Sequence, residues 1–175
     1  MSEIQEILFD ERSIETKVGE LAAQIARDYA GKDLVLICIL KGGVVFMADL
    51  MRRIPFPVTI DFISASSYGM SITAAKDIRI KKDIEIDVRG RHVLLVDTIV
   101  DTGETLAYLF KRLSEQGPAG LEAAVLLDKK PRRTSEVRLK YRGFEIPDRF
   151  VVGYGVDCAE QYRNLPYVAA IDTVT

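Results

Sequence analysis

A short polar segment that follows an apolar run carries the clearest chemistry in this sequence. Residues 93–96 are apolar, two carboxylates follow four positions apart as Asp97 and Asp101, and the chain continues as Thr102-Gly103-Glu104-Thr105. Ahead of a helix, the backbone N–H groups and threonine hydroxyls of such a loop would attract one phosphate, and the positive end of the helix would strengthen that attraction. Gly103 permits φ values or a close approach that a side chain forbids. The structural alternative is an ordinary capped helix start.

Three further segments carry side chains that suit a phosphorylated or aromatic substrate. Leu40-Lys41-Gly42-Gly43 is a glycine-rich strand end, for which a plain turn is the alternative, and Lys129 follows a buried strand beside other basic residues. Phe150 has a ring that can stack on another ring, and the guanidinium of Arg163 can face a phosphate. Taken alone, Lys129 would be a solvated lysine, Phe150 a core residue and Asp157 a turn acid.

The order of these segments resembles that of type I phosphoribosyltransferases. An apolar strand, two acids, two apolar residues, Asp-Thr-Gly and a threonine make up that family's phosphoribosyl pyrophosphate motif, and neither a Walker loop nor a dinucleotide fingerprint occurs here. Residues 40–43, 126–129 and 143–166 are similar to the hypoxanthine-guanine branch of the family. The similarity extends from about Leu8 to Ile171, with one departure: Thr98 stands where the family has its second acid.

The resemblance implies an enzyme of purine salvage. It would transfer the 5-phosphoribosyl group from phosphoribosyl pyrophosphate to hypoxanthine or guanine, giving IMP or GMP and pyrophosphate. Two alternatives stay open, a transferase that prefers xanthine or adenine and a regulatory relative that senses nucleotides. A complete base pocket and leaving-group site disfavours the sensor, and so does a net charge of -2, which provides no attraction to nucleic acid.

The resemblance also assigns roles to individual residues. Asp101 would be the catalytic base that accepts or orients the proton on purine N7, and Asp97 and Asp157 would contact Mg²⁺. The phosphoribosyl pyrophosphate would be bound by Lys41, Gly42, Asp97, Thr98, Asp101, Thr102, Gly103, Glu104, Thr105 and Arg163. The purine would be bound by Lys129, Phe150, the backbone of Val151, and Asp157. Ser67 and Tyr68 would belong to a flap that closes over the reacting centre and excludes water.

Lys129 would set the base specificity. A fixed ammonium donor opposite purine O6 suits an oxopurine, whereas adenine presents an amino donor at the same place and would leave both groups unpaired. The resemblance therefore implies a 6-oxopurine substrate. The residue types do not rank hypoxanthine, guanine and xanthine.

The elements that must position these residues alternate between helix and strand. Ile14 to Tyr29 shows a helical stripe ended by Gly31, residues 34–40 read as a strand buried on both faces, and a short helical pattern runs to about Arg53. Further strands are predicted at 93–96, 123–127, 150–152 and 167–171, with a helical stripe from Leu106 to Leu113. This alternation predicts an α/β fold with a mostly parallel sheet, helices on both faces and a ligand site at the strand C-termini.

The segment between the first two predicted strand–helix units is more polar. Residues 58–63 alternate as in a strand, 64–71 read as a loop, and Ile78 and Ile80 followed by Ile84, Ile86 and Val88 suggest a half-exposed pair of strands. We expect a flexible flap over about 64–82. A small hood is expected from the N-terminal segment together with residues 128–175.

Composition bounds the remaining properties. With 175 residues, of which 48% are hydrophobic, the chain suits one domain over residues 1–175. No apolar run approaches the roughly 20 residues of a membrane span, and two cysteines form neither a metal-ligand spacing nor a disulfide framework. We expect a cytoplasmic protein that binds neither membrane nor nucleic acid; the resemblance implies a homodimer or homotetramer.

Overall fold

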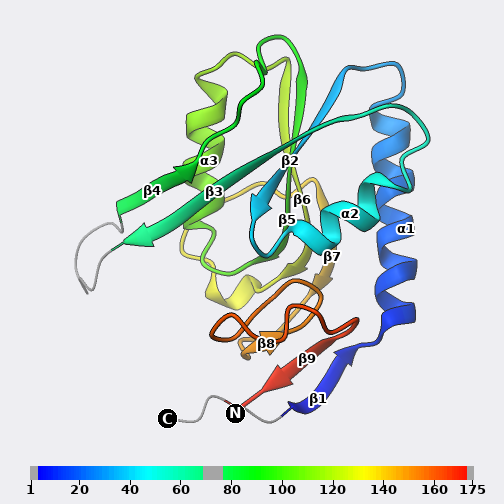
Figure 1. Cartoon of the computed structure of the whole chain (residues 1–175), viewed down its shortest axis with the longest axis vertical. Coiled ribbons are helices and arrows are strands. Elements are labelled where there is room, and N and C mark those ends of the chain that lie inside the picture. The colour runs from blue at the N-terminus through cyan, green and yellow to red at the C-terminus, as the bar shows by residue number, and fades with distance from the viewer. Residues whose placement is uncertain (1–3, 69–76, 173–175) are drawn as a thin grey trace.

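The structure is a computed structural model that describes residues 4–68 and 77–172 (Figure 1). The elements in chain order are β1 (Ile4–Phe9), α1 (Glu11–Asp28), β2 (Leu34–Leu40), α2 (Val44–Met51), β3 (Thr59–Tyr68), β4 (Asp77–Lys82), β5 (His92–Val100), α3 (Glu104–Ser114), β6 (Gly120–Asp128), a 3-10 turn (Lys130–Arg132), β7 (Tyr141–Glu145), β8 (Val151–Val152) and β9 (Val168–Ile171). No helix in these two ranges is both long and apolar enough to cross a membrane.

A mostly parallel sheet forms the centre of the molecule, as the alternation of elements predicts. Its strand order is β4-β3-β2-β5-β6-β7. β2 pairs in parallel with both β3 and β5, β5 with β6, and β6 with β7, whereas β4 is antiparallel to β3. The C-terminal ends of β2, β5 and β6 therefore lie side by side at one edge of the sheet.

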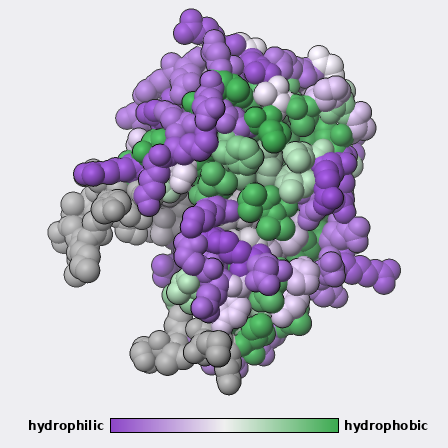
Figure 2. Space-filling view, in the orientation of Figure 1, coloured by the Kyte–Doolittle hydropathy of each residue, from purple (hydrophilic) through white to green (hydrophobic). Residues whose placement is uncertain are grey.

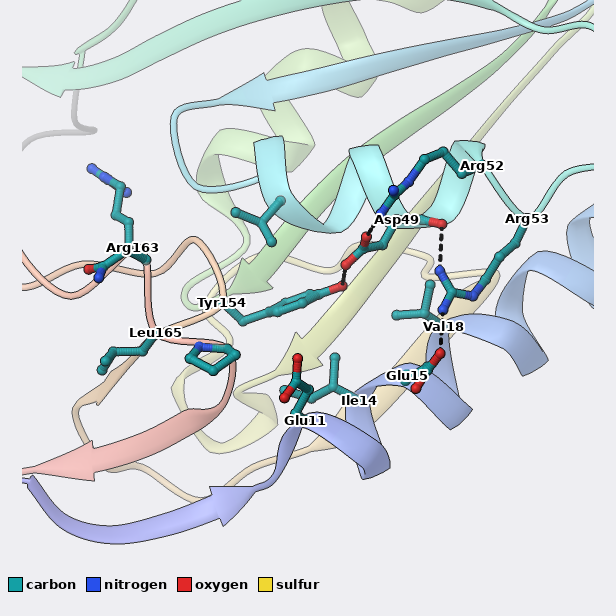
Figure 3. A pocket seen from close by; sticks show the side chains of 13 residues that line it. Glu11, Ile14, Glu15, Val18, Asp49, Arg52, Arg53, Tyr154, Arg163 and Leu165 are labelled. Carbon is teal, nitrogen blue, oxygen red and sulfur yellow. Dashed lines mark hydrogen bonds and ion pairs between the residues drawn. The ribbon is translucent and has the colours of Figure 1, made fainter.

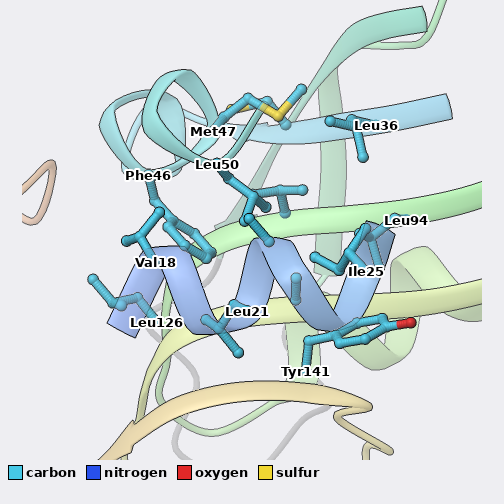
Figure 4. Packing of buried hydrophobic residues seen from close by; sticks show 14 of the residues in the cluster. Val18, Leu21, Ile25, Leu36, Phe46, Met47, Leu50, Leu94, Leu126 and Tyr141 are labelled. Carbon is cyan, nitrogen blue, oxygen red and sulfur yellow. The ribbon is translucent and has the colours of Figure 1, made fainter. Parts of the chain in front are cut away.

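Helices cover both faces of this sheet and create two apolar cores. In β2, Leu36 and Cys38 point toward α1 and α2, and the alternate residues Ile37 and Ile39 belong to the core beneath α3. Figure 4 shows the first of these cores, where Val18, Leu21 and Ile25 of α1 pack with α2 against the strands. The predicted strand at 34–40 is thus buried on both faces, which explains its uninterrupted apolar sequence.

A second, smaller sheet joins the two ends of the chain. β9 lies between β1 and β8 and is antiparallel to both, with Ile4 opposite Ile171 and Val151 opposite Ala170. In Figure 1 this sheet lies at the bottom, beyond the end toward which β2 points. It places Phe150 and Val151 near the edge of the central sheet where the predicted site residues gather.

Two sequence predictions of local structure are wrong, and a third gives a strand that is too short. Residues 64–68 continue β3 instead of forming a loop, because β4 pairs with them, with Ser64 opposite Lys82 and Ala65 opposite Ile80. Residues 84–88 form no strand, because the Asp61 carboxylate accepts the N–H groups of Glu85 and Ile86 at 2.7 and 3.1 Å. The strand predicted at 93–96 is confirmed, but it extends from His92 to Val100.

Asp61 fastens the 83–88 segment to the central sheet, and its loss should destabilise the fold. Burial raises the pKa of this carboxyl, but the N–H groups of Glu85, Phe62 and Ile86 together lower it by more. The pKa therefore lies below its ordinary value of 3.8. A lowered folded-state pKa stabilises the fold above the unfolded-state pKa, and this contribution is lost as pH falls through the folded-state pKa. Asp61→Asn should cost about 1 to 3 kcal/mol of unfolding free energy at pH 7.

Urea unfolding monitored at pH 7 and below pH 4 measures this effect. The exposed Asp87, whose carboxylate accepts from Arg89 N at 2.9 Å, supplies the control variant Asp87→Asn, which should change stability little. Equal stability of wild type and Asp61→Asn at pH 7 would show that the predicted role of Asp61 is wrong.

Candidate active site

The C-terminal ends of three neighbouring strands bring the predicted site residues together. The loop Lys41-Gly42-Gly43 follows β2, Asp101 follows β5, and Lys129 follows β6. Because these strands are parallel and adjacent, their ends meet at one edge, where α/β sheets bind ligands. Residues separated by almost ninety positions in the sequence thus face a common space.

A cavity of about 250 Å³ lies at this edge. Its lining includes six of the residues predicted to bind phosphoribosyl pyrophosphate, namely Gly42, Asp97, Asp101, Thr102, Gly103 and Thr105. Glu104 does not line it, and the Glu104 carboxylate accepts a hydrogen bond from the Thr134 hydroxyl at 3.4 Å. The cavity is therefore bounded by backbone, hydroxyl and carboxylate groups together.

The loop between β5 and α3 packs closely against residues 133–137. Gly103 has a left-handed backbone with φ 84°, and a Cβ atom there would lie 3.1 Å from the carbonyl oxygen of Ser135. The N–H groups of Thr134 and Ser135 donate to Thr102 O at 3.0 and 3.1 Å, which fixes the loop from its outer side. α3 begins directly after Gly103, so its N-terminal N–H groups border the cavity.

Asp97 is a carboxylate whose surroundings disfavour its charged form. Burial raises the pKa of Asp97 to about 7, against the lowering effect of the N–H groups of Thr98 and Ile99. No lysine or arginine of the described ranges forms an ion pair with Asp97. A cation bound next to Asp97 would favour its charged form.

Thr98 does not line the cavity but reaches the loop after β2. Its side chain is fully buried, and Oγ1 donates to the carbonyl oxygen of Gly42 at 2.8 Å. Gly155 completes this contact, because a Cβ atom at Gly155 would lie 2.2 Å from the same carbonyl oxygen. In this chain the hydroxyl that replaces the family's second acid therefore holds the Lys41–Gly43 loop. The peptide between Leu40 and Lys41 is cis.

This contact predicts a role for Thr98 in binding through the loop. Thr98→Val keeps the shape of the side chain but leaves the Gly42 carbonyl without its donor, at a cost of about 1 to 2 kcal/mol. We expect KM for phosphoribosyl pyrophosphate, the substrate that the resemblance implies, to rise about five- to thirtyfold, with a smaller change in kcat. Thr98→Ser retains the hydroxyl and should stay close to wild type in the same steady-state assay. Equal KM values for the valine variant and wild type would contradict this role.

Lys129 and Phe150 lie next to Asp101, which is the member of this trio that lines the cavity. Lys129 is only 6% exposed, its Nζ lies 3.8 Å from Asp101 Oδ2, and it lies 5.7 Å from the centre of the Phe150 ring. Phe150 is 61% exposed, so its ring is accessible to a flat ligand. Val151 is buried in β8 directly beside it. A donor, an acceptor and an aromatic face are thereby combined at one place.

Two charged residues of this region escaped the sequence analysis. Arg132 Nε lies 3.2 Å from Asp101 Oδ1 and fixes the second oxygen of that carboxylate. Glu160 Oε2 lies 2.9 Å from Lys41 Nζ and 3.5 Å from Arg163 Nη2. The sequence could have indicated Glu160, because it lies three positions before the predicted phosphate ligand Arg163. It could not single out Arg132, which is one of several basic residues between positions 129 and 133.

The predicted magnesium ligand Asp157 is engaged by its own segment. Its Oδ1 lies 2.9 Å from Arg163 Nη2, and its Oδ2 accepts from Glu160 N at 2.9 Å. Residues 4–68 and 77–172 contain no group of three or more His, Cys, Asp or Glu side chains arranged to hold a metal ion. Protein side chains alone therefore do not make a closed metal cage in these ranges.

A second cavity, of about 420 Å³, lies between α1, α2 and residues 154–166 (Figure 3). Tyr154 donates its hydroxyl proton to Asp49 Oδ2 at 2.6 Å, and Asp49 also pairs with Arg52. In Figure 3 Arg163 points away from this pair. This cavity therefore lies on one side of the segment that carries Arg163, and the guanidinium of Arg163 points to the other side.

The predicted flap is described only in part. The backbone of Ser67 and Tyr68 belongs to the end of β3, next to the cavity-lining Ala65. Residues 69–76, including Gly69 of the flap motif, lie outside the described ranges. A lid function of Ser67 and Tyr68 stays a prediction.

The parallel sheet and the cavity at its strand ends match a known class of protein. A family model for the phosphoribosyl transferase domain matches residues 5–159, and the chain belongs to this family. The hypoxanthine phosphoribosyltransferase of Haemophilus influenzae is 44% identical, over 95% of this chain and 94% of the relative. The hypoxanthine-guanine phosphoribosyltransferase of Dictyostelium discoideum is 45% identical, with 95% of each chain covered.

The similarity extends to solved structures. A crystal structure of a hypoxanthine-guanine phosphoribosyltransferase from Bacillus anthracis superimposes with a TM-score of 0.92 at 45% sequence identity, covering 98% of this chain and 100% of that one. Within its family, the chain therefore falls among the hypoxanthine and hypoxanthine-guanine phosphoribosyltransferases. The resemblance stated from the sequence is confirmed.

Proposed function

We propose that this protein transfers the 5-phosphoribosyl group of phosphoribosyl pyrophosphate to a 6-oxopurine, forming IMP from hypoxanthine or GMP from guanine and releasing pyrophosphate. The relatives named above support this activity. The observation that carries the proposal is the placement of Lys129 and Asp101, 3.8 Å apart, beside the exposed ring of Phe150. An oxopurine has its O6 acceptor and its N7 on one edge, which matches a donor next to an acceptor.

Each group at this edge has a part in the transfer. A purine nitrogen attacks ribose C1 while the bond from C1 to pyrophosphate breaks, and positive charge develops on the sugar ring. Lys129 donates to O6 and Asp101 accepts or orients the N7 proton, which favours the attacking form of the base. The ring of Phe150 supports the purine from one face, and Val151 meets its 2-position edge.

The phosphate groups are proposed to bind on both sides of the ribose. The N–H groups and hydroxyls of residues 101–105 hold the 5′-phosphate at the start of α3. Lys41, the amides of its loop and Arg163 offset the negative charge that grows on the departing pyrophosphate. Thr98 contributes through its hydrogen bond to Gly42, which fixes the loop that carries Lys41.

Asp97 and Asp157 are proposed to bind Mg²⁺ together with the substrate. The raised pKa of Asp97, caused by burial without an opposing cation, fits a carboxylate that is charged when a metal ion is bound. Mg²⁺ commonly uses one or two carboxylates, substrate phosphates and water as ligands, so a closed protein cage is not required. When bound, the ion neutralises charge on the pyrophosphate leaving group.

We further propose one phosphoribosyltransferase domain over residues 1–175, with the sheet β1-β9-β8 as part of the hood and residues 64–82 as the flap. The exposed side of α2 is proposed as a contact in a homodimer or homotetramer. Figure 2 shows apolar side chains gathered over α2 and β3, where Val44 and Ile60 are exposed. We propose a cytoplasmic location and no binding to nucleic acid or membrane.

A nucleotide-formation assay tests the proposed function. Hypoxanthine, guanine, xanthine and adenine are each supplied with phosphoribosyl pyrophosphate, with Mg²⁺ and with the ion removed by a chelator. We expect turnover with hypoxanthine or guanine in the presence of Mg²⁺ and little turnover with adenine. Turnover with adenine alone, or full activity without Mg²⁺, would refute the substrate or the cofactor assignment respectively.

A further inference from the structure

Glu160 lies between the two cationic side chains that are proposed to bind pyrophosphate. Its Oε2 lies 2.9 Å from Lys41 Nζ and 3.5 Å from Arg163 Nη2. Lys41 comes from the loop after β2 and Arg163 from the segment before β9, so this one carboxylate bridges two distant parts of the chain. Its position is that of an anion at the place where pyrophosphate should bind.

An unusual turn places Glu160 there. Ala159, Glu160 and Tyr162 have left-handed backbones with φ of 51°, 64° and 73°, a conformation that is unfavourable for a non-glycine residue. The turn is held because Glu160 N donates to Asp157 Oδ2 at 2.9 Å and because Cys158 and Gln161 exchange backbone hydrogen bonds of 3.2 and 3.0 Å. The chain thus maintains an unfavourable backbone that presents Glu160 to Lys41.

The segment around this turn is anchored from behind. Tyr154 is fixed to Asp49 of α2, as Figure 3 shows, and Arg163 Nη1 donates to Gly155 O at 2.8 Å. Arg163 also pairs with Asp157 at 2.9 Å. Movement of Glu160 away from Lys41 therefore requires no change in how the rest of the segment is attached.

The contact between Glu160 and Lys41 is weak enough for a substrate to displace. The side chains of Glu160 and Lys41 are 64% and 66% exposed, and ion pairs between exposed side chains contribute little to stability. Pyrophosphate carries several negative charges, so it attracts Lys41 and Arg163 more strongly than one carboxylate does. The same charges repel Glu160.

We propose that Glu160 is a positioning residue that acts as an internal counter-anion at the pyrophosphate subsite. It holds Lys41 and Arg163 together before the substrate binds and competes with the pyrophosphate group, so it lowers the affinity for pyrophosphate and eases product release. This inference rests on the proposed function, because it assumes that Lys41 and Arg163 bind the pyrophosphate group. It adds a residue with a role in binding rather than in the bond-making step.

The test compares Glu160→Gln with wild type in calorimetric titrations with sodium pyrophosphate, with and without Mg²⁺. Glutamine keeps the size and the backbone conformation but removes the charge. We expect pyrophosphate to bind about three- to tenfold more tightly at low ionic strength, and we expect the gain to shrink as salt screens it. In a Lys41→Met background, Glu160→Gln should increase the affinity for pyrophosphate less, because one of the two cations that Glu160 contacts is gone.

The matched control is Glu20→Gln, which removes the charge of another exposed glutamate, one that pairs with Lys17 on α1. It should leave pyrophosphate affinity unchanged. Equal or weaker binding by Glu160→Gln would overturn the inference, and weakening only with Mg²⁺ would identify Glu160 as a metal ligand instead. If wild type itself bound no pyrophosphate, the proposed function would fail as well, which separates the two cases.

Discussion

Replacement of Asp101 by asparagine should lower kcat by about 10²- to 10⁴-fold, the range that a positioned general base contributes. Asparagine has nearly the same shape but cannot accept the proton from purine N7. It also loses the ion pairs that Lys129 and Arg132 form with the carboxylate, at 3.8 and 3.2 Å. KM for phosphoribosyl pyrophosphate should change much less, because residues 102–105 still provide their N–H groups and hydroxyls.

Single-turnover and steady-state rates at saturating substrate measure this effect. Asp148 provides a matched control, since its Oδ1 also lies 3.8 Å from Arg132 Nε. Asp148→Asn should retain most of the turnover. A kcat for Asp101→Asn within a few-fold of wild type would remove Asp101 from the role of the base.

Replacement of Lys129 by methionine should abolish most of the preference for oxopurines. Methionine fills a similar buried volume but offers no donor to O6, and hydrogen bonds to charged groups contribute about 1.5 to 3 kcal/mol. We expect kcat/KM for hypoxanthine to fall about 10- to 100-fold. The kcat/KM for adenine should not fall, because the amino group of adenine no longer faces an ammonium. The ratio of kcat/KM for hypoxanthine to that for adenine should therefore decrease.

Competition assays with hypoxanthine and adenine give this ratio directly. The adjacent Lys130 serves as the control because its side chain is exposed and its Nζ lies 4.0 Å from Glu145 Oε2. Lys130→Met should keep the wild-type ratio. An unchanged ratio in Lys129→Met would mean that another group recognises the 6-position of the base.

The central sheet could be predicted because its determinants are local. The strand at 34–40 has a continuous apolar sequence, and the helix before it shows a regular apolar stripe that is buried at Val18, Leu21 and Ile25. β1 escaped prediction because its residues are largely exposed and it depends on β9 at the other end of the chain. β7 contains Gly143, which suggests a turn; a Cβ atom there would lie 2.4 Å from Leu126 O, so close strand packing requires glycine.

The candidate site was predictable where short motifs carry the chemistry. Asp97, Asp101 and Gly103 line one cavity, as the motif around them suggests. The partners of Thr98 and Glu160 were not predictable, because Gly42 and Lys41 lie far away in the sequence and the contacts exist only once the loop after β2 is folded. The same holds for Asp61, whose carboxylate replaces strand pairing for Glu85 and Ile86.

The central claim is that residues 97–105 form a pocket for the ribose phosphate, with carboxylates beside the sugar ring. A crystal structure of the protein with phosphoribosyl pyrophosphate and Mg²⁺ tests it most directly. We predict the 5′-phosphate against the N–H groups and hydroxyls of residues 101–105, with Asp97 facing the ribose and the metal ion. A 5′-phosphate bound elsewhere, or a complex in which these residues touch no ligand, would contradict the account.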